Sequence, residues 1–473
     1  MINMIISLIT TPIITRLVDP VAYGQLSVYN VYVNIGMFIF CLGMDQALVR
    51  FFYNKEDLSY RQSLLFRCWF LPAIALMLIG GLGFVFIIAN WIQIDGDLTY
   101  FWFLFIGVVT QVLYRIALMV LRLQYKSKTY AFVNCLHKLS YIIIALLLIC
   151  LIRSDHFVLL IVATIGSTLL SIAVSIIAER KLWMPNFSNE NAISYKELLK
   201  FGAPFIVSLG VSAFYSAIDK LAIEYFCDYA EVGIYASAAS IVSIFGIIQT
   251  AFNSLWAPMA IERYNIDPND KEFHVQGYNY ITVVMIFVGA SLILVKDLIV
   301  FLLGESYRQA AFIIPFLTFY PILYTISETT VSGINFKKKS YWHLIIAVVC
   351  CLVNLLGNIL LIPLYGAKGA SIATGISYVL LFTLRTLIAN FLFPVKYKIY
   401  KIYIVLLLLG GLALYNTFYT FTIISLGLYI ITLLVLFLLY KKTIFDGFRY
   451  LKKTLQKKGE SNEDICDSDI LSK

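Results

Sequence analysis

Charged residues are scarce in this sequence, and its cysteines and histidines follow no metal-binding pattern. Asp, Glu, Lys and Arg make up only 13% of the 473 residues, about half the share that a soluble domain carries. The eight cysteines form no C-x-x-C pair, and the four histidines (His137, His156, His274 and His343) are dispersed. We therefore expect no disulfide framework, no metal site and no cofactor. A phosphate-binding loop is also missing, so we expect no nucleotide-binding domain.

Apolar residues dominate instead, at 61% of the chain, and the mean hydropathy is +0.86. Runs of about 20 such residues are typical of transmembrane helices. Met1–Thr15 lacks a basic leader and a small-residue cleavage site, so we interpret it as a retained, short first span. The sequence thus predicts an all-α polytopic membrane protein with about fourteen spans: Met1–Thr15, Leu26–Val49, Leu65–Ala89, Tyr100–Leu121, Ala131–Ile152, Phe157–Ala178, Gly202–Phe226, Val232–Met259, Tyr278–Val295, Gln309–Gly333, Tyr341–Ile362, Ala367–Leu392, Ile402–Tyr419 and Phe421–Tyr440.

The loops divide the basic residues unequally between the two sides of the membrane. Of the 36 Lys and Arg residues, four lie within spans, and only Arg16, Arg153, Lys296, Arg308 and Lys368 fall on one side. All the others fall on the opposite side, which the positive-inside rule assigns to the cytoplasm. Both termini are then cytoplasmic. Topology and anionic lipid explain the net charge of +9, and no nucleic-acid partner is needed.

A short internal sequence repeat indicates two similar halves. Asp19 and Gly24 are five residues apart, as are Asp228 and Gly233, at a constant offset of 209 residues. Each pair lies at the junction where one apolar segment ends and the next begins. We predict two six-helix lobes, residues 1–178 and 202–392, related by a pseudo-two-fold axis along the membrane normal, with a cavity between them.

Three further segments complete the predicted organisation. Residues 179–201 form a cytoplasmic linker, in which Ser194–Glu197 has a capping-box pattern that predicts a short interfacial helix. Residues 402–440 hold two additional spans. Residues 441–473 form a tail whose basic part lies on the inner leaflet and whose polar, partly acidic part from Glu460 is disordered.

Six cations within or at the ends of spans are candidates for binding an anionic headgroup: Arg16, Arg50, Arg115, Lys138, Lys220 and Arg385. Arg binds phosphate through a planar fork, and Lys binds it as a point charge. The alternative is that cations at helix ends extend to lipid phosphates, which applies best to Arg50 and Lys138.

Four acids in or beside spans are candidates for coupling transport to a proton or sodium ion: Asp45, Asp219, Glu224 and Glu328. The alternative for each is a salt bridge to one of the cations. In particular, Asp219 and Glu224 both have a spacing that allows them to neutralise Lys220.

Several segments, in order between about residue 10 and residue 395, resemble one known family. TRLVDPVAYGQLSVYN (15–30) and LGMDQALVRFF (42–52) resemble the opening of the polysaccharide-biosynthesis flippases. These belong to the multidrug/oligosaccharidyl-lipid/polysaccharide exporter superfamily. IDKLAIEYFCDYAEVGIYASA (218–238), GESYRQAAFIIPFL (304–317) and NFKKKS (335–340) are similar to later parts, and NLLGNILLIPLYGAKGASIATGISY (354–378) is the most specific match.

The resemblance implies a V-shaped pair of lobes around a central cavity. It also implies transport of an undecaprenyl-pyrophosphate-linked oligosaccharide from the cytoplasmic to the outer leaflet of a bacterial inner membrane, for O-antigen or capsule. A polysaccharide polymerase and chain-length enzymes are then possible partners. Arg16 and Arg50 approximately match arginines that related peptidoglycan-precursor flippases place near their first two spans.

Other functions stay open. A drug or cation antiporter of the same fold would need acids in excess in its cavity, whereas the intramembrane cations here are at least as numerous. A peptidoglycan-precursor flippase would use the same fold. A membrane-embedded polymerase or glycosyltransferase is the alternative from another class. The only pattern that favours it is Asp95-Gly96-Asp97, which is also a common turn.

Overall fold

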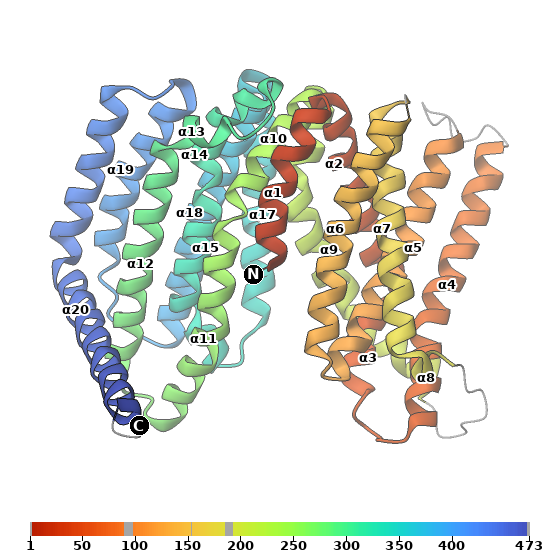
Figure 1. Ribbon diagram of the computed structural model, residues 1–473, viewed down its shortest axis with the longest axis horizontal. Coiled ribbons are helices and arrows are strands. Elements are labelled where there is room, and N and C mark those ends of the chain that lie inside the picture. Colours follow the sequence, from red (N-terminus) through yellow and green to blue (C-terminus); the bar gives the residue numbers. More distant parts are fainter. Residues whose placement is uncertain (1, 89–97, 153, 185–192, 471–473) are drawn as a thin grey trace. The chain divides into compact units, whose positions relative to one another are not determined.

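Helices form the whole fold in the computed structural model, which describes residues 2–88, 98–152, 154–184 and 193–470. No strand occurs among these residues (Figure 1), so the all-α prediction is confirmed. Asp95–Asp97 lie outside the described residues. The helices are α1 (Ile2–Leu17), α2 (Pro20–Phe40), α3 (Met44–Phe51), α4 (Leu58–Ile88), α5 (Leu98–Leu123), α6 (Ser127–Leu151), α7 (His156–Ala178), α8 (Arg180–Trp183), α9 (Tyr195–Phe226), α10 (Tyr229–Val242), α11 (Phe245–Ile266), α12 (Lys271–Leu294), α13 (Lys296–Val300), the 3-10 helix η1 (Glu305–Phe312), α14 (Ile314–Leu317), α15 (Phe319–Thr330), α16 (Ser332–Phe336), α17 (Tyr341–Tyr365), α18 (Ala367–Leu392), α19 (Ile399–Phe418) and α20 (Ile423–Ile470).

Most of these helices are long and apolar enough to span a membrane. Within the described ranges, ten helices meet this criterion, and three bent pairs raise the number to thirteen. The bent pairs are α2 with α3 (51°), α10 with α11 (45°), and η1 with the segment Ile314–Thr330 that comprises α14 and α15 (56°). All thirteen coincide with predicted spans. The first predicted span coincides with α1, which has 16 residues against the roughly 20 that a span needs, so the total of fourteen stays a prediction.

The bend between α2 and α3 has a local cause in the backbone. Leu42 and Gly43 have φ angles of 51° and 68°, a left-handed conformation that ends a helix. A Cβ on Gly43 would also overlap the carbonyl oxygen of Gly202 in α9. Glycine at this position therefore permits both the turn and the close packing of α9 against it.

The chain divides into two compact units. The first comprises residues 1–244, 301–310 and 347–373, and the second comprises residues 245–300, 311–346 and 374–473. The first unit thus includes segments from both predicted lobes. The predicted division into residues 1–178 and 202–392 rests on the sequence repeat, and it stays a prediction.

The two junctions of the internal repeat, at the start of α2 and at the start of α10, lie against each other in the first unit. Asp19 caps α2 by accepting a hydrogen bond from the Ala22 amide at 2.9 Å, and Asp228 caps α10 by accepting one from the Glu231 amide, also at 2.9 Å. A carboxylate at this position satisfies an amide that the helix leaves without a partner. Both caps and both bonded amides are related by the offset of 209 residues, so the two junctions have the same local structure.

Two glycines let α2 and α10 touch backbone to backbone. A Cβ on Gly24 would overlap the carbonyl oxygen of Tyr229, and a Cβ on Gly233 would overlap that of Pro20. Positions 24 and 233 are equivalent in the repeat, as are 20 and 229, so the contact is reciprocal. Small residues at such a crossing favour helix association in a membrane, where van der Waals packing replaces the hydrophobic effect.

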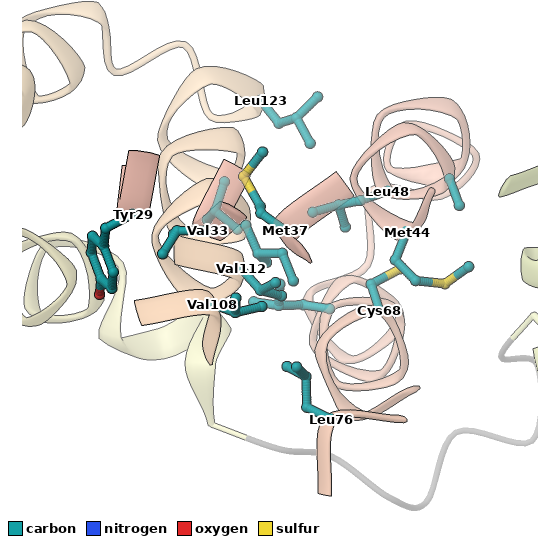
Figure 2. Close-up of a cluster of buried hydrophobic side chains, with 14 of the residues drawn as sticks. Tyr29, Val33, Met37, Met44, Leu48, Cys68, Leu76, Val108, Val112 and Leu123 are labelled. Atoms are coloured by element: carbon teal, nitrogen blue, oxygen red, sulfur yellow. The ribbon is translucent and has the colours of Figure 1, made fainter. Parts of the chain in front are cut away.

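A cluster of apolar side chains joins α2, α3, α4 and α5 within the first unit. Figure 2 shows Val33 and Met37 of α2 near Val108 and Val112 of α5. Met44 and Leu48 of α3 and Cys68 and Leu76 of α4 extend the cluster. Close packing of these shapes holds one side of the unit together.

The predicted interfacial helix in the linker is wrong as a separate element. The Ser194 hydroxyl accepts a hydrogen bond from the Lys196 amide at 3.2 Å and caps the helix, as the pattern suggests. The helix then continues without interruption for 32 residues to Phe226. Between Tyr195 and Phe201 the helix contains no glycine or proline, and Leu198 is fully buried, so nothing ends the helix in the linker; Gly202 and Pro204 lie further along inside it.

In the second unit, α12, α19 and α20 lie side by side (Figure 1). Helix α20 has 48 residues and contains one non-helical position, Tyr440. The helix continues to Ile470, and the predicted disorder from Glu460 stays a prediction. Extending an existing helix avoids the cost of nucleation, so a polar sequence can stay helical there.

We expect Gly24→Ala and Gly233→Ala each to destabilise the protein, because the new methyl group must push α2 and α10 apart. Overpacking of this kind costs about 1–3 kcal/mol. Thermal unfolding of the purified protein in detergent measures the effect. Gly410→Ala in α19 is the matched control, since a Cβ there meets no atom within 4 Å. Unfolding of Gly24→Ala at the wild-type temperature would show that the close contact is unnecessary.

Candidate functional site

The first unit contains a cavity of about 360 Å³. Seven helices line it: α1, α2, α5, α6, α7, α9 and α10. They come from both sides of the predicted linker at residues 179–201. The predicted spans one, two, four, five and six thus share one cavity with the predicted spans seven and eight.

Polar but uncharged side chains form much of the cavity wall. Hydroxyl and amide groups come from Thr10, Thr11, Ser27, Asn30, Asn34, Thr110, Gln111, Thr164, Thr168 and Ser240. Such groups donate and accept hydrogen bonds, which suits a ligand rich in hydroxyl groups. Three tyrosines, Tyr23, Tyr29 and Tyr141, add apolar faces to the same wall.

Two of the predicted cations, Lys138 and Lys220, also line this cavity. Lys138 lies in the middle of α6 and Lys220 in the second half of α9. No Asp or Glu is among the described lining residues, and neither ammonium has a carboxylate oxygen within 4.0 Å in the described part of the chain. The cavity is therefore cationic, and a ligand that carries two negative charges would complement it.

The position of Lys138 corrects one interpretation made from the sequence. The residue does not lie at a helix end, so its side chain cannot simply follow the helix terminus to lipid phosphate. Its neighbour His137 also lines the cavity, where Nε2 lies 3.2 Å from Oγ1 of Thr168. The His137 ring stacks on Tyr114 with the centroids 4.9 Å apart.

The two acids near Lys220 form hydrogen bonds with other groups. Glu224 accepts hydrogen bonds from the hydroxyls of Tyr32 at 3.1 Å and Tyr229 at 3.2 Å. Asp219 accepts hydrogen bonds from Tyr235 and Asn358 instead. The salt bridges that the spacing allows between these acids and Lys220 are absent from the described residues, because both carboxylates face other helices.

Asp219 belongs to a network of neutral polar groups. Its Oδ2 accepts a hydrogen bond from the Tyr235 hydroxyl at 2.5 Å, and its Oδ1 accepts one from Nδ2 of Asn358 at 2.8 Å. Nδ2 of Asn358 also lies 3.1 Å from Oδ1 of Asn354. Both asparagines are buried, and Oδ1 of Asn358 has no hydrogen-bond partner. A buried acceptor in that state is costly until a donor or a cation satisfies it.

Arg115 and Asp45 neutralise each other outside the cavity wall. Arg115 Nη2 lies 2.6 Å and Nε 2.8 Å from Oδ2 of Asp45, whose side chain is only 1% exposed. The guanidinium also lies over the Phe38 ring, 4.9 Å from its centroid. This pair accounts for one predicted cation and one predicted coupling acid.

Arg385 and Glu328 form a second such pair, in the second unit. Arg385 Nη1 lies 2.8 Å from Glu328 Oε1 and 2.7 Å from the Ser327 hydroxyl. The Tyr324 ring stacks below the guanidinium at 4.8 Å. The salt-bridge alternative considered for both carboxylates is thus the one found in the structure.

Arg16 and Arg50 lie at helix ends. Arg16 is exposed in the last turn of α1, and Arg50 is exposed in the last turn of α3, 5.7 Å from the Phe51 ring centroid. Neither lines the cavity described above. Their role in binding stays a prediction.

The uncharged polar side chains of the cavity wall were not among the site residues predicted from the sequence, which were all charged. The sequence does contain a pattern that indicates this wall. Ser27, Asn30 and Asn34 are three and four residues apart and therefore lie on one face of α2. Gly107, Thr110 and Gln111 do the same on α5. The structure adds that these two faces look into one cavity. No group of three or more His, Cys, Asp and Glu residues that could bind a metal occurs among the described residues.

We expect Arg115→Ala to destabilise the protein, because it leaves the buried Asp45 carboxylate without its cationic partner, with only the neutral donors Gln46 and Cys41. Breaking a buried pair in this way typically costs 3–5 kcal/mol. Thermal unfolding in detergent and the amount of protein in the membrane report the loss. Arg50→Ala is the control, since Arg50 is exposed, and Asp45→Asn combined with Arg115→Gln should recover most of the stability. A wild-type unfolding temperature for Arg115→Ala would contradict this account.

Several known membrane proteins are similar to this chain in sequence or in structure. A curated membrane protein of unknown role from Haemophilus influenzae is 23% identical over 303 residues, which cover 63% of this chain and 71% of that protein. The lipid II flippase MurJ in an inward closed conformation has a similar structure, with a TM-score of 0.67 and 15% identity over 95% of this chain and 98% of MurJ. An inward-facing multidrug resistance transporter of the MATE family, in the MOP superfamily, matches with a TM-score of 0.59 and 13% identity over 82% of this chain and 94% of that one. At these identities the likeness is one of fold.

The sequence match to a family covers more than half of the chain. The model of the family described as "polysaccharide biosynthesis protein" matches residues 1–262, which include all the helices that line the cavity. The chain is therefore a multi-pass membrane protein with the fold of MOP-type flippases and transporters, and it belongs to the polysaccharide biosynthesis protein family.

Proposed function

We propose that this protein is a flippase for undecaprenyl-pyrophosphate-linked oligosaccharides. It moves the repeat unit from the cytoplasmic to the outer leaflet of a bacterial inner membrane, where the unit becomes part of O-antigen or capsule. Both termini are then cytoplasmic. The observation that carries the proposal is the cavity with two lysines, ten hydroxyl or amide side chains and no carboxylate among its described lining residues.

The chemistry of the cavity fits the two polar parts of such a substrate. Each sugar hydroxyl that enters hydrocarbon without a partner costs several kcal/mol, and the hydroxyl and amide wall replaces the lost hydrogen bonds with water. Lys138 and Lys220 supply two positive charges for a diphosphate that carries two negative ones. The polyprenyl chain needs no such site, because it stays in the lipid.

The direction of transport follows from the charge of the substrate. A membrane potential that is negative inside favours outward movement of an anion, by roughly 4–5 kcal/mol for two charges at about 100 mV. The cavity volume of about 360 Å³ is at the low end for ligand pockets. The cavity must therefore widen to admit a repeat unit of several sugars, as alternating access requires. We expect the polymerase and chain-length enzymes to act on the unit after it has crossed.

A drug or cation antiporter of the same fold is the second candidate, and the MATE-like fold is the observation in its favour. Its cargo would be positively charged, and the two cavity lysines would repel it. A lipid-linked peptidoglycan precursor shares the diphosphate chemistry, so genetic analysis must separate it from a polysaccharide repeat unit. A membrane-embedded polymerase is the third candidate.

We expect Lys138→Gln and Lys220→Gln each to weaken substrate binding about 10- to 100-fold, because each removes a charged hydrogen bond worth roughly 1.5–3 kcal/mol. The measurement is complementation of a gene deletion in the native host, followed by analysis of surface glycan and lipid-linked intermediates. The deletion should abolish the polymer and leave repeat units on the cytoplasmic side. Wild-type protein and Lys128→Gln should restore export, since Lys128 is exposed at the start of the same helix, α6.

Other outcomes of this deletion would support other functions. An intact glycan with altered sensitivity to cationic drugs would favour the antiporter. Repeat units on the outer face that are not polymerised would indicate a polymerase. A lethal arrest of cell-wall synthesis would indicate a peptidoglycan precursor. Full complementation by the combined variant Lys138→Gln/Lys220→Gln would show that the cavity lysines are not needed for transport.

Among the four acids, we propose Asp219 as the group that binds a coupling proton or sodium ion. Asp45 and Glu328 are held by arginines, and Glu224 accepts from two tyrosines. Asp219 accepts hydrogen bonds from the neutral groups of Tyr235 and Asn358, beside the unpartnered Oδ1 of Asn358, and the Lys220 ammonium attracts it without forming a salt bridge. Carboxylate and amide oxygens are suitable ligands for a hard cation.

We expect Asp219→Asn to remove any dependence of the transport rate on a proton or sodium gradient, because the amide carries no charge to bind the ion. Proteoliposomes with an imposed gradient provide the measurement. Glu224→Gln should keep the dependence, since the tyrosine hydroxyls that bond Glu224 remain. A wild-type rate that responds to neither gradient would rule out coupling at Asp219 and leave the membrane potential as the driving force.

A further inference from the structure

The second unit contains another cavity, of about 1060 Å³, which the proposed transport does not use. It is bounded by the start of α12, the last turn of α18, residues 394–398, the start of α19 and the part of α20 around Tyr440. The predicted spans begin or end at each of these segments. The cavity therefore lies where the helices leave the membrane, on the side that the basic loops assign to the cytoplasm.

A break in α20 shapes this cavity. Tyr440 has φ and ψ angles of −115° and 17°, which interrupt the helix. The Leu439 carbonyl oxygen accepts a hydrogen bond from Lys401 Nζ at 2.6 Å, and the same ammonium lies 5.5 Å from the Tyr440 ring centroid. Lys401 thus stabilises the break, and the break lets the basic segment after Tyr440 leave the direction of the span.

Positive charge dominates the cavity wall. Five lysines line it, namely Lys271, Lys396, Lys398, Lys401 and Lys442, against a single acid, Glu272. Glu272 accepts a hydrogen bond from Gln276 at 3.4 Å. In the described part of the chain, no carboxylate lies within 4.0 Å of any of the five ammonium groups. Lysines gathered in this way repel one another unless an anion lies between them.

The rest of the wall combines apolar side chains with the neutral polar groups of Asn279, Asn390 and Thr443, and the cavity is large enough for more than a phosphate ion. Val275, Val395 and Leu439 line the cavity beside the lysines. The volume is at the upper end for small-molecule pockets. An amphiphile with a phosphate group and an attached apolar part matches both kinds of wall, whereas a free phosphate would leave the apolar wall uncovered.

We propose that this cavity binds the headgroup of an anionic membrane phospholipid. The phosphodiester lies among the lysines, and the glycerol and first acyl carbons contact the apolar wall. Basic pockets between helices at the cytoplasmic surface are suited to such headgroups. A lipid there links the ends of α12, α18, α19 and α20, and its binding is independent of which substrate the protein transports.

The test is native mass spectrometry of the purified full-length protein, titrated with phosphatidylglycerol or with phosphatidylcholine of the same acyl chains. We expect wild-type protein to prefer the anionic lipid. The variant Lys396→Gln/Lys398→Gln/Lys442→Gln, whose three positions are exposed, should bind phosphatidylglycerol at least tenfold more weakly, because basic residues near an anionic headgroup each contribute to affinity. Binding of phosphatidylcholine should not change.

The matched control is Lys337→Gln/Lys338→Gln/Lys339→Gln. It removes the same charge from exposed positions of the same unit that do not line the cavity. It should retain the preference for phosphatidylglycerol. An equal loss in both variants, or no preference in the wild type, would overturn the proposal.

Competition distinguishes a lipid from a soluble phosphate compound. Millimolar inorganic phosphate or glycerol phosphate should leave bound phosphatidylglycerol in place. If either displaces it, the site takes a soluble phosphate and the lipid assignment is wrong. Binding of a polyprenyl diphosphate with no binding of phosphatidylglycerol would also overturn the proposal, since it would make the cavity a substrate site.

Discussion

A charge inside a membrane is costly unless it is paired, hydrated or bound by a ligand of opposite sign, and this constraint explains how the polar residues of this protein are arranged. The intramembrane arginines Arg115 and Arg385 each meet a carboxylate within 3 Å. Lys138 and Lys220 do not, and both line a cavity with polar walls. The difference is chemically reasonable, because a planar guanidinium presents several N–H groups in a fixed geometry, whereas an ammonium is a hydrated point charge. Paired arginines thus support the helices, and the lysines remain available for an anion.

The close contact of α2 with α10 provides the frame for that cavity. Gly24 and Gly233 bring the two backbones together, and residues of both helices about two turns further along, among them Asn30 and Ser240, line the cavity. A contact made of backbone atoms and matched glycines has few ways to rearrange, because interiors are close-packed. The site therefore has one rigid boundary, and the caps at Asp19 and Asp228 fix where its two helices begin.

Much of the fold was predictable from the sequence, for reasons that are local. Apolar runs of about 20 residues predicted the helices, since every backbone hydrogen bond must be satisfied within a spanning segment. The equivalent Asp and Gly positions predicted that the two junctions share a structure. Bends were harder: the break between α2 and α3 depends on left-handed backbone angles at Leu42 and Gly43. The length of α9 was also missed, because the capping pattern at Ser194 marks where a helix starts and says nothing of where it ends.

The sequence by itself determined the class of the protein, the approximate spans, the set of intramembrane charges and the family resemblance, because hydropathy and motifs are properties of consecutive residues. Only the tertiary structure decided which charges neutralise each other. Asp45 and Arg115 are 70 residues apart, and Glu328 and Arg385 are 57 apart, whereas Asp219 and Glu224, beside Lys220 in the sequence, face other groups. Pairing depends on which helix faces which, and helix packing is a property of the whole chain. For the same reason, the sequence left two alternatives for Lys138, a cavity cation or a side chain that reaches lipid phosphate, and the packing of the helices places it in the cavity wall.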